Sequence, residues 1–399
     1  MKAINSSIGS AGRIGDSIRS DCFAEIKLTT KGGIKINIQS KVGLLYGKSI
    51  RKQITDFAKS YNLKNAEITL NDKGALPFVI DARLEAAIKR ADNSIEKNFV
   101  NKSIKYHNKN QKDRLRRTRL YIPGNEPNYF INAHLHKPDC IILDLEDSVA
   151  PTEKDAARLL VRNALLNVNF GSAERMVRIN QLPAGLKDLD QITENVQTIL
   201  VPKCESVEHI KQVDEYFNLI GTNNKQAENI FLIPIIESAL GVVNAYEIAS
   251  ASKRICALAI GLEDYTADIG AARTKAGIES LFARCAVINA AKAAGIQTLD
   301  SVFPDLNDDE GLAASTTEAK ALGFDGKGCI HPKQIKIIHN AFLPTEKEVE
   351  YARTIIAAYE DAVKNGSGVI SIGSKMIDPP VIKRALKILK VAASSKKRS

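Results

Sequence analysis

Eight short apolar segments between residues 119 and 331 constrain the fold of this chain more than any other feature of its sequence. Each segment is rich in leucine or β-branched residues, and each is followed by a stretch that can form a helix. Continuous apolar segments are typical of parallel strands that are buried on both faces. The segments occupy residues 119–123, 140–147, 176–180, 198–203, 230–237, 255–261, 298–303 and 328–331.

Eight β–α repeats over roughly 250 residues predict a (β/α)8 TIM barrel. The competing fold is a doubly wound open sheet, which usually has fewer repeats. In its dinucleotide-binding form it has a G-x-G-x-x-G motif after the first strand, and the chain has no such motif there. We therefore expect an α/β protein that is built on a TIM barrel.

The stretch over residues 93–112 is polar and rich in asparagine and lysine, which is typical of a linker. Before it, strand-like stretches alternate with helical ones, a pattern that predicts a small α+β domain. The expected units are this domain at 1–92, the linker at 93–112, the barrel at 113–350, and a C-terminal helical extension with a basic tail at 351–399.

The chain has 399 residues and a formal net charge of +10. Much of the excess lies in residues 102–119 and 396–398, so a solvated linker and tail explain it, with phosphate contact by a few linker arginines as the alternative. Aromatic and basic residues do not alternate as they do in RNA-binding modules, so we expect no nucleic-acid partner. No apolar run has the length of a membrane span or a signal peptide, which predicts a cytoplasmic protein without a membrane partner.

Polar residues end most of the apolar segments, and two carboxylates among them are candidate metal ligands. Glu237 ends the fifth segment, and Asp264 follows the sixth. The C-terminal ends of barrel strands meet at one mouth, so these side chains should lie close together. Two carboxylates whose remaining positions are filled by water suit Mg²⁺, whereas zinc would need histidine or cysteine nearby. The alternative is that either carboxylate pairs with a lysine or caps the next helix.

A third candidate is Arg178, near the end of the third segment. Its planar guanidinium can bind a substrate carboxylate through two parallel hydrogen bonds. A structural ion pair inside the barrel mouth is the alternative.

Residues from about 114 to 390 resemble the family of aldolases and lyases acting on acyl thioesters, which includes the citrate lyase beta chain. The matching stretches occur in the family's order and cover nearly the whole expected barrel. They are R-R-T-R-L-Y-I-P-G at 116–124, L-D-L-E-D-S-V-A at 143–150, V-R-I-N at 177–180, I-E-S at 236–238, G-L-E-D-Y at 261–265 and M-I-D-P-P-V-I-K-R-A at 376–385.

The resemblance implies a Mg²⁺-dependent carbon–carbon lyase and gives each matching residue a role. Glu237 and Asp264 resemble the metal ligands, and Arg178 resembles the arginine that holds the substrate and its developing enolate. Asp378 resembles a catalytic aspartate that completes the site of a neighbouring subunit; its alternative role is a helix N-cap. The other implied positions are substrate contacts at Arg117, Gly124 and Asn180, and groups around metal-bound water at Glu146 and Asp147.

Residues 1–92 resemble the acyl carrier (gamma) chains of citrate lyases, most clearly in D-K-G-A-L at 72–76 and A-R-L-E-A at 82–86. Such carriers hold a phosphoribosyl-dephospho-CoA arm on a serine. Aligned on Asp21 without a gap, the attachment position falls on Arg19, with Ser20 one residue later and Ser17 two residues earlier. We expect attachment at Ser20; the alternative is a carrier fold without an arm.

Together these resemblances imply cleavage of a citryl thioester to oxaloacetate and an acetyl thioester, as part of citrate lyase. The partners that they imply are citrate or a related 3-hydroxyacyl thioester, a citrate lyase alpha (transferase) chain, and further copies of this chain in a homo-oligomer such as a trimer. The alternative is a lyase of free CoA thioesters (malyl-CoA, citramalyl-CoA or citryl-CoA) with a degenerate carrier domain. A non-enzymatic carrier would not need the barrel residues named above.

Overall fold

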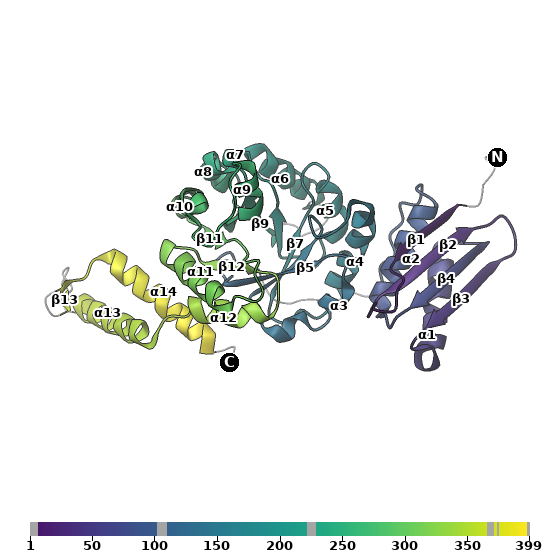
Figure 1. Ribbon diagram of the computed structural model, residues 1–399, viewed down its shortest axis with the longest axis horizontal. Helices are drawn as coiled ribbons and strands as arrows, with labels where there is room; N and C mark the ends of the chain where they lie inside the picture. The colour runs from purple at the N-terminus through teal and green to yellow at the C-terminus, as the bar shows by residue number, and fades with distance from the viewer. Residues whose placement is uncertain (1–6, 102–109, 222–228, 365–370, 373–374, 397–399) are drawn as a thin grey trace.

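The computed structural model describes residues 7–101, 110–221, 229–364, 371–372 and 375–396, which form three connected parts (Figure 1). A small sheet domain comes first, a closed barrel follows, and a helical hairpin ends the chain. The middle of the expected linker, residues 102–109, lies outside the described residues.

The N-terminal domain is a four-stranded sheet with two helices on one face, which confirms the expected α+β class. Its strand order is β1-β2-β4-β3, and only the β3–β4 pair is parallel. Alternate residues of β2 and β4 are fully buried under the helices, as a half-buried sheet requires. The elements are β1 (Ile8–Gly12), β2 (Cys22–Leu28), β3 (Ile34–Ser40), α1 (Gly43–Ser60), β4 (Ala66–Asp72) and α2 (Pro77–Ala91).

Eight parallel strands close into a barrel, so the predicted TIM barrel is confirmed. Along most of the strands, apolar side chains point alternately into the barrel and outward under the helices, and both sets are buried. The strands are β5 (Thr118–Pro123), β6 (Cys140–Asp144), β7 (Glu174–Arg178), β8 (Thr198–Val201), β9 (Phe231–Ile236), β10 (Ala257–Ile260), β11 (Gln297–Asp300) and β12 (Gly326–Cys329).

Helices surround the barrel, and short ones also follow several strands at its mouth. They are α3 (Pro127–Phe130), α4 (Lys154–Asn167), α5 (Leu186–Ile192), α6 (Val207–Gly221), α7 (Ala239–Val243), α8 (Ala245–Ser250), α9 (Leu262–Asp268), α10 (Ile278–Ala293), α11 (Asp309–Leu322) and α12 (Lys333–Phe342), with 3-10 turns η1 (Ala133–His136) and η2 (Pro151–Glu153). In the described part of the chain, no helix is both long enough and apolar enough to span a membrane.

The C-terminal extension is a helical hairpin that projects from the barrel (Figure 1). Helices α13 (Glu346–Lys364) and α14 (Pro379–Lys396) pack on each other through a small apolar core of their own. Two short strands, β13 (Ser371–Ile372) and β14 (Lys375–Met376), pair between the helices. The extension therefore begins at Glu346, five residues before the expected boundary at 351.

Helix α2 joins the N-terminal domain to the barrel. Residues on one of its faces, such as Val79 and Ala82, belong to the barrel core, while Ile80 and Leu84 belong to the core of the small domain. The described end of the expected linker is also held in place, because Phe99 is buried in the small domain's core. The carrier-like domain is thus docked on the barrel. The part of the expected linker around Phe99 packs against the small domain.

Candidate active site

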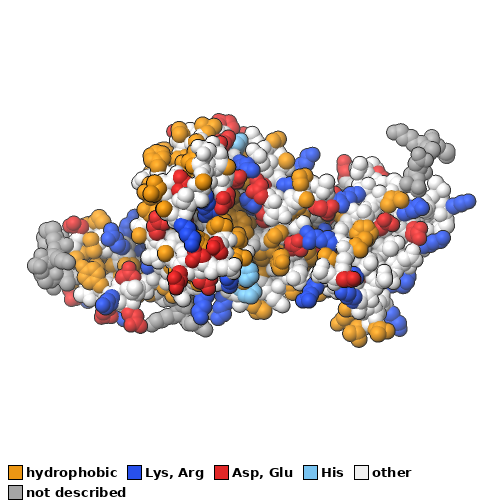
Figure 2. Space-filling view, viewed as in Figure 1, with side chains coloured by type: hydrophobic (Ala, Val, Ile, Leu, Met, Phe, Trp, Pro, Cys, Tyr) orange, Lys and Arg blue, Asp and Glu red, His pale blue; other side chains and the backbone are white. Residues whose placement is uncertain are grey.

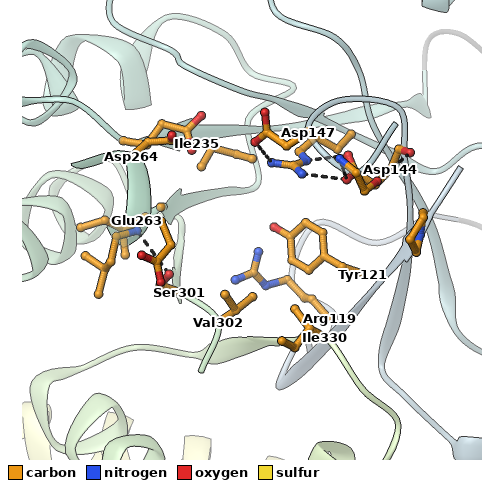
Figure 3. A pocket seen from close by; sticks show the side chains of 17 residues that line it. Arg119, Tyr121, Asp144, Asp147, Ile235, Glu263, Asp264, Ser301, Val302 and Ile330 are labelled. Atoms are coloured by element: carbon orange, nitrogen blue, oxygen red, sulfur yellow. Dashed lines mark hydrogen bonds and ion pairs between the residues drawn. The ribbon is translucent and has the colours of Figure 1, made fainter. Parts of the chain in front are cut away.

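A cavity of about 420 Å³ opens at the barrel mouth, among residues at and after the C-terminal ends of the strands (Figure 3). This is where the fold class places working residues. Apolar side chains such as Ile235 and Ile260 form part of the wall, and acidic and basic side chains form the rest. The lining residues are Arg119, Tyr121, Pro123, Asp144, Asp147, Ser148, Arg178, Ile235, Glu237, Ile260, Gly261, Leu262, Glu263, Asp264, Ser301, Val302 and Ile330.

Both expected metal ligands line this cavity. Glu237 directly follows β9 and is buried, and Asp264 lies in the first turn of α9, after β10. One carboxylate oxygen of Glu237, Oε1, accepts the backbone N–H of Lys203 at 2.6 Å. The other oxygen, Oε2, lies so close to Gly261 that a Cβ there would come within 2.5 Å of it. A side chain at residue 261 would therefore push the Glu237 carboxylate out of position.

The electrostatics of this pair favour a bound cation. Burial raises the pKa of Glu237 to about 8, and the repulsion of Asp264 and Glu146 adds to the effect of burial. Within the described residues, neither Glu237 nor Asp264 makes an ion pair, and no group of three or more His, Cys, Asp or Glu has metal-site geometry. Two carboxylates with open positions fit Mg²⁺, which usually retains several water ligands in proteins.

Arg178 faces carboxylates on two sides. Its Nε and Nη2 donate to the two oxygens of Asp144 at 2.6 and 2.7 Å, and its Nη1 lies 2.7 Å from Glu146 and 3.3 Å from Asp147. Burial acts to raise the pKa of Asp144, but the hydrogen bonds and charge of Arg178 outweigh it and leave this pKa below its usual value. The guanidinium also lies over the Tyr121 ring, 5.5 Å from its centre. Arg178 is therefore rigidly held at the cavity wall, and a substrate carboxylate must compete with these partners.

Glu146 and Asp147 lie between Arg178 and Lys203. The Lys203 ammonium is 3.4 Å from Glu146 and 3.9 Å from Asp147. Burial raises the pKa of Glu146 to about 7, with Asp147 adding to the shift and Arg178 opposing it. Lys203 therefore contacts both acidic groups: its backbone N–H binds Glu237, and its ammonium group lies near Glu146 and Asp147. The position of Lys203 at a strand end did not predict this role. Its φ of 48° is left-handed, which costs free energy in a non-glycine residue.

The structure does not bring Arg117, Gly124 and Asn180 to the cavity. Arg117 precedes β5, at the opposite end of the barrel from the mouth, where its guanidinium forms a buried ion pair with Asp139. The amide of Asn180 is held by Asp188 and Lys154. Partners within the chain therefore already occupy the side chains of these two predicted substrate contacts.

Gly124 lies just beyond the cavity-lining residue Pro123 and has a packing role. Its N–H donates to the carbonyl of Asp144 at 2.7 Å, and a Cβ on Gly124 would come within 2.6 Å of that same oxygen. Glycine at this position therefore allows β5 and β6 to approach closely where their polar ends meet.

Arg119 is a cavity residue to which we gave no role from the sequence. It lies within β5, and its side chain is 1% exposed. The available signal was a charged residue inside a segment that is otherwise apolar, directly after a run of arginines. That run concealed it, because Arg114, Arg116 and Arg117 make ion pairs at the other end of the barrel.

Asp378 does not line the cavity of its own chain. It lies just before α14 in the hairpin and is exposed. Its backbone carbonyl accepts the N–H of Val381 at 2.9 Å as the helix begins.

Ser20 and Ser17 lie on the β1–β2 connection of the small domain, with Ser17 more exposed than Ser20. The Ser20 hydroxyl is 3.3 Å from the side-chain oxygen of Asn128 in α3, the helix that follows β5 at the barrel mouth. Next to it, Arg13 pairs with Glu126 on the same loop. Ser20 therefore faces the rim from which the cavity opens.

Comparisons with known proteins agree with this architecture. Residues 117–332 match the family model HpcH/HpaI aldolase/citrate lyase, and residues 11–91 match an acyl carrier model described as the malonate decarboxylase delta subunit. The second match confirms the carrier-like character of the N-terminal domain.

Individual relatives agree with the family match. Citrate lyase subunit beta of Haemophilus influenzae is 42% identical over 285 residues, which are 70% of this chain and 98% of that protein. Mitochondrial citramalyl-CoA lyase of Mus musculus is 34% identical over 296 residues, covering 71% of this chain and 88% of that protein.

Among solved structures, CitE from Mycobacterium tuberculosis in complex with magnesium, acetoacetate and coenzyme A is similar to this chain. It is 30% identical with a TM-score of 0.57, and the match covers 71% of this chain and all of that one. The fold, the site and these matches lead to one conclusion: the chain is a lyase of the HpcH/HpaI aldolase/citrate lyase family, with an acyl carrier-like domain at its N-terminus.

Proposed function

We propose that this chain cleaves a citryl thioester into oxaloacetate and an acetyl thioester, as the beta-type component of a citrate lyase. The observation that carries the proposal is the buried Glu237 beside Asp264, two carboxylates without ion-pair partners in the described chain that face a substrate-sized cavity. The Haemophilus influenzae relative is a citrate lyase subunit, which supports a citryl substrate.

Glu237 and Asp264 would hold Mg²⁺, the metal present in the Mycobacterium tuberculosis CitE structure. When bound, Mg²⁺ would acidify and orient the substrate hydroxyl. Arg178, which is fixed by Asp144, would stabilise the negative charge that develops on the enolate oxygen at the cavity wall.

The reaction is a retro-Claisen cleavage. The C3 hydroxyl loses its proton and becomes the keto oxygen of oxaloacetate, while the C2–C3 bond breaks. Its electron pair remains on C2 as the enolate of the acetyl thioester, and a proton then adds to C2. We assign delivery of that proton to Asp378 of a second copy of the chain, because this residue is exposed on the projecting hairpin and does not line its own cavity.

A homo-oligomer is part of this proposal. Exposed apolar side chains on α8 and α10 (Tyr246, Ile278 and Phe282) suit contact with another copy. Figure 2 shows apolar side chains on the surface over this part of the barrel. A trimer would give each site one neighbour, and an alpha chain would supply the citryl group.

The carrier-like domain would hold the thioester arm on Ser20. Ser20 faces the rim of the mouth through Asn128, so an arm attached there starts close to the cavity. Peptide mapping of residues 13–27 from the protein purified with its arm-attaching enzymes should locate a dephospho-CoA-type adduct on Ser20. S20A should lack the adduct and S17A should retain it; the reverse result would move the attachment to Ser17.

The alternative function is cleavage of free CoA thioesters without an arm. It is favoured by the similarity to mitochondrial citramalyl-CoA lyase and by Arg19 at the aligned attachment position. An active native enzyme whose residues 13–27 are unmodified would select this alternative.

The metal part of the proposal is tested with E237Q, assayed on citryl-CoA with saturating Mg²⁺. We expect cleavage to fall by about 1,000-fold or more, because the variant loses a ligand charge at the reacting hydroxyl. E310Q removes an exposed carboxylate on α11, outside the cavity, and is the matched control with wild-type activity. Full activity of E237Q would refute the metal site.

A further inference from the structure

Arg119 is a buried arginine that retains free hydrogen-bond donors inside the cavity. Its Nη2 donates to the backbone carbonyl of Asp300 at 2.6 Å, while its Nε and Nη1 are buried without a partner within the described chain. One oxygen of the nearby Asp300 carboxylate, Oδ2, is bound by Lys327 at 2.7 Å and by Arg284 at 3.2 Å, and the two cations already balance the charge of this carboxylate. Arg119 therefore keeps an unneutralised charge at a site that is 1% exposed.

The strand geometry explains how this charge reaches the cavity. Leu120 and Ile122 pack outward under the helices, while Tyr121 packs with the residues inside the barrel, so Arg119 also points inward. On the adjacent strand it pairs with Gly328, where a Cβ would come within 2.7 Å of Val302 and 3.4 Å of Tyr121. The absence of a side chain at Gly328 leaves room for Val302 and Tyr121, which line the same cavity as Arg119.

The cavity consequently has two poles (Figure 3). Glu237 and Asp264 lie at the ends of β9 and β10, whereas Arg119 reaches the end of β11 beside Tyr121 and Val302. Figure 3 shows its guanidinium directed towards the middle of the cavity. Arg178, the other cationic residue among those that line the described cavity, faces Asp144, Glu146 and Asp147. Arg119 is therefore the cavity arginine whose guanidinium retains unpaired hydrogen-bond donors.

An unpaired guanidinium in a partly apolar wall costs free energy, and an anionic ligand group would remove that cost. The acyl groups cleaved by lyases of this kind share a hydroxyl and one carboxylate on C3 and differ in the third substituent. That substituent is hydrogen in malyl, methyl in citramalyl and carboxymethyl in citryl groups. Only the citryl group brings a second carboxylate.

We propose that Arg119 binds the carboxymethyl carboxylate of the substrate and so selects citryl over citramalyl and malyl thioesters. The inference rests on the proposed lyase function and adds the specificity-determining residue to it. The hydroxyl and the shared carboxylate then face the Glu237–Asp264 pole. The second carboxylate faces Arg119, so the charges of the substrate match both poles.

The test compares two ligands that differ by one carboxylate: freshly dissolved oxaloacetate and pyruvate. Each is titrated by calorimetry into the full-length protein with saturating Mg²⁺. We expect wild-type protein to bind oxaloacetate about 10- to 100-fold more tightly, the range for hydrogen bonds to a charged group. R119M should weaken oxaloacetate binding by that factor and leave pyruvate binding unchanged, while R119K should retain part of the preference.

R114M is the matched control, because Arg114 pairs with Glu174 outside the cavity. It should bind both ligands as the wild-type protein does. Equal weakening of both ligands by R119M, or a wild-type protein without a preference, would overturn the role of Arg119. The same proteins are assayed on citryl-CoA. If the wild-type protein cleaves citryl-CoA and R119M cleaves it equally well, only this inference is refuted. If the wild-type protein neither binds the two ligands nor cleaves citryl-CoA, the proposed function is refuted as well.

Discussion

At the scale of single residues, the site is a set of carboxylates whose charges are balanced to different degrees. Asp144 is paired with Arg178 in a close bidentate contact, so its charge is stabilised although it is buried. Glu237 is also buried, and within the described chain it accepts the backbone N–H of Lys203 but forms no ion pair. Its charge is therefore less well balanced than that of Asp144, which supports the proposed metal-ligand role.

This difference predicts how metal binding depends on pH. The pKa of Glu237 is raised to about 8 in the metal-free protein, so its carboxyl group is mostly protonated at lower pH and must lose a proton to bind Mg²⁺. The affinity for Mg²⁺ should rise by about tenfold per pH unit up to about pH 8 and then level off. Glu146, with a pKa of about 7, would steepen the lower part of the curve.

Isothermal titration of Mg²⁺ at several pH values measures this dependence. E237Q should bind Mg²⁺ weakly at every pH, without the rise towards pH 8. A wild-type affinity that stays constant between neutral and alkaline pH would contradict a metal site at Glu237.

Among the helices and strands, α2 positions the carrier-like domain on the barrel. Besides its two apolar faces, it contributes Glu85, which is fully buried and forms an ion pair with Arg162 of α4 at 2.5 Å. The same arginine donates to the carbonyl of Phe99. A second pair, Arg90 with Asp155 at 2.6 Å, lies nearer the surface.

Breaking the buried pair should loosen the docking. R162M removes the shorter of the two ion pairs of the buried Glu85 and leaves the pair with Lys89 at 3.0 Å, so we expect a cost of up to about 3–5 kcal/mol. In urea unfolding, we expect the wild-type protein to unfold in one transition and R162M to show an earlier, separate transition of the N-terminal domain.

The double variant E85M/R162M should recover most of the stability, because both charges are gone. K52M, which breaks an exposed pair with Asp56 on α1, is the control and should change the midpoint little. An R162M protein with a wild-type unfolding curve would show that the two domains are not coupled through this contact.

The elements also show what the sequence could predict. Apolar segments bounded by polar ends located the eight strands and brought Glu237, Asp264 and Arg178 to one mouth, because strand order and direction follow from the repeat. The family resemblance, by contrast, implied a substrate contact at Arg117, but this residue precedes β5 and forms an ion pair with Asp139.

Side-chain partners were beyond the reach of the sequence pattern. Asn180 has the position of a substrate contact, but Asp188 and Lys154 already occupy its amide. Arg119 was hidden in an arginine run, and its free donors become visible only when the partners of the other arginines are known. The docking of α2 on α4 could not be predicted either, because it includes an ion pair between Glu85 and Arg162, two residues that are far apart in the sequence.

At the scale of the whole molecule, the hairpin of α13 and α14 projects away from a barrel whose own cavity lacks Asp378. A proton donor at Asp378 therefore requires two chains for one complete site. The carrier-like domain, in contrast, is docked beside its own mouth, with Ser20 at the rim.

Shared sites predict complementation between two inactive variants. E237Q lacks a proposed metal ligand, and D378N lacks the proposed proton donor, so a mixed oligomer contains some sites with both residues intact. After co-refolding, the mixture should cleave citryl-CoA well above either variant alone. Mixing E237Q with D264N, which damage the same cavity, is the control and should give no recovery; equal failure of both mixtures would contradict a site built from two chains.

The proposed reaction of the barrel is cleavage of the carbon–carbon bond of a citryl thioester. The most direct measurement is product identification by mass spectrometry after incubating the wild-type protein with citryl-CoA and Mg²⁺, with and without EDTA. We expect oxaloacetate and acetyl-CoA in equal amounts, and no reaction in EDTA. Recovery of intact citryl-CoA, or its hydrolysis to citrate and free CoA, would contradict it.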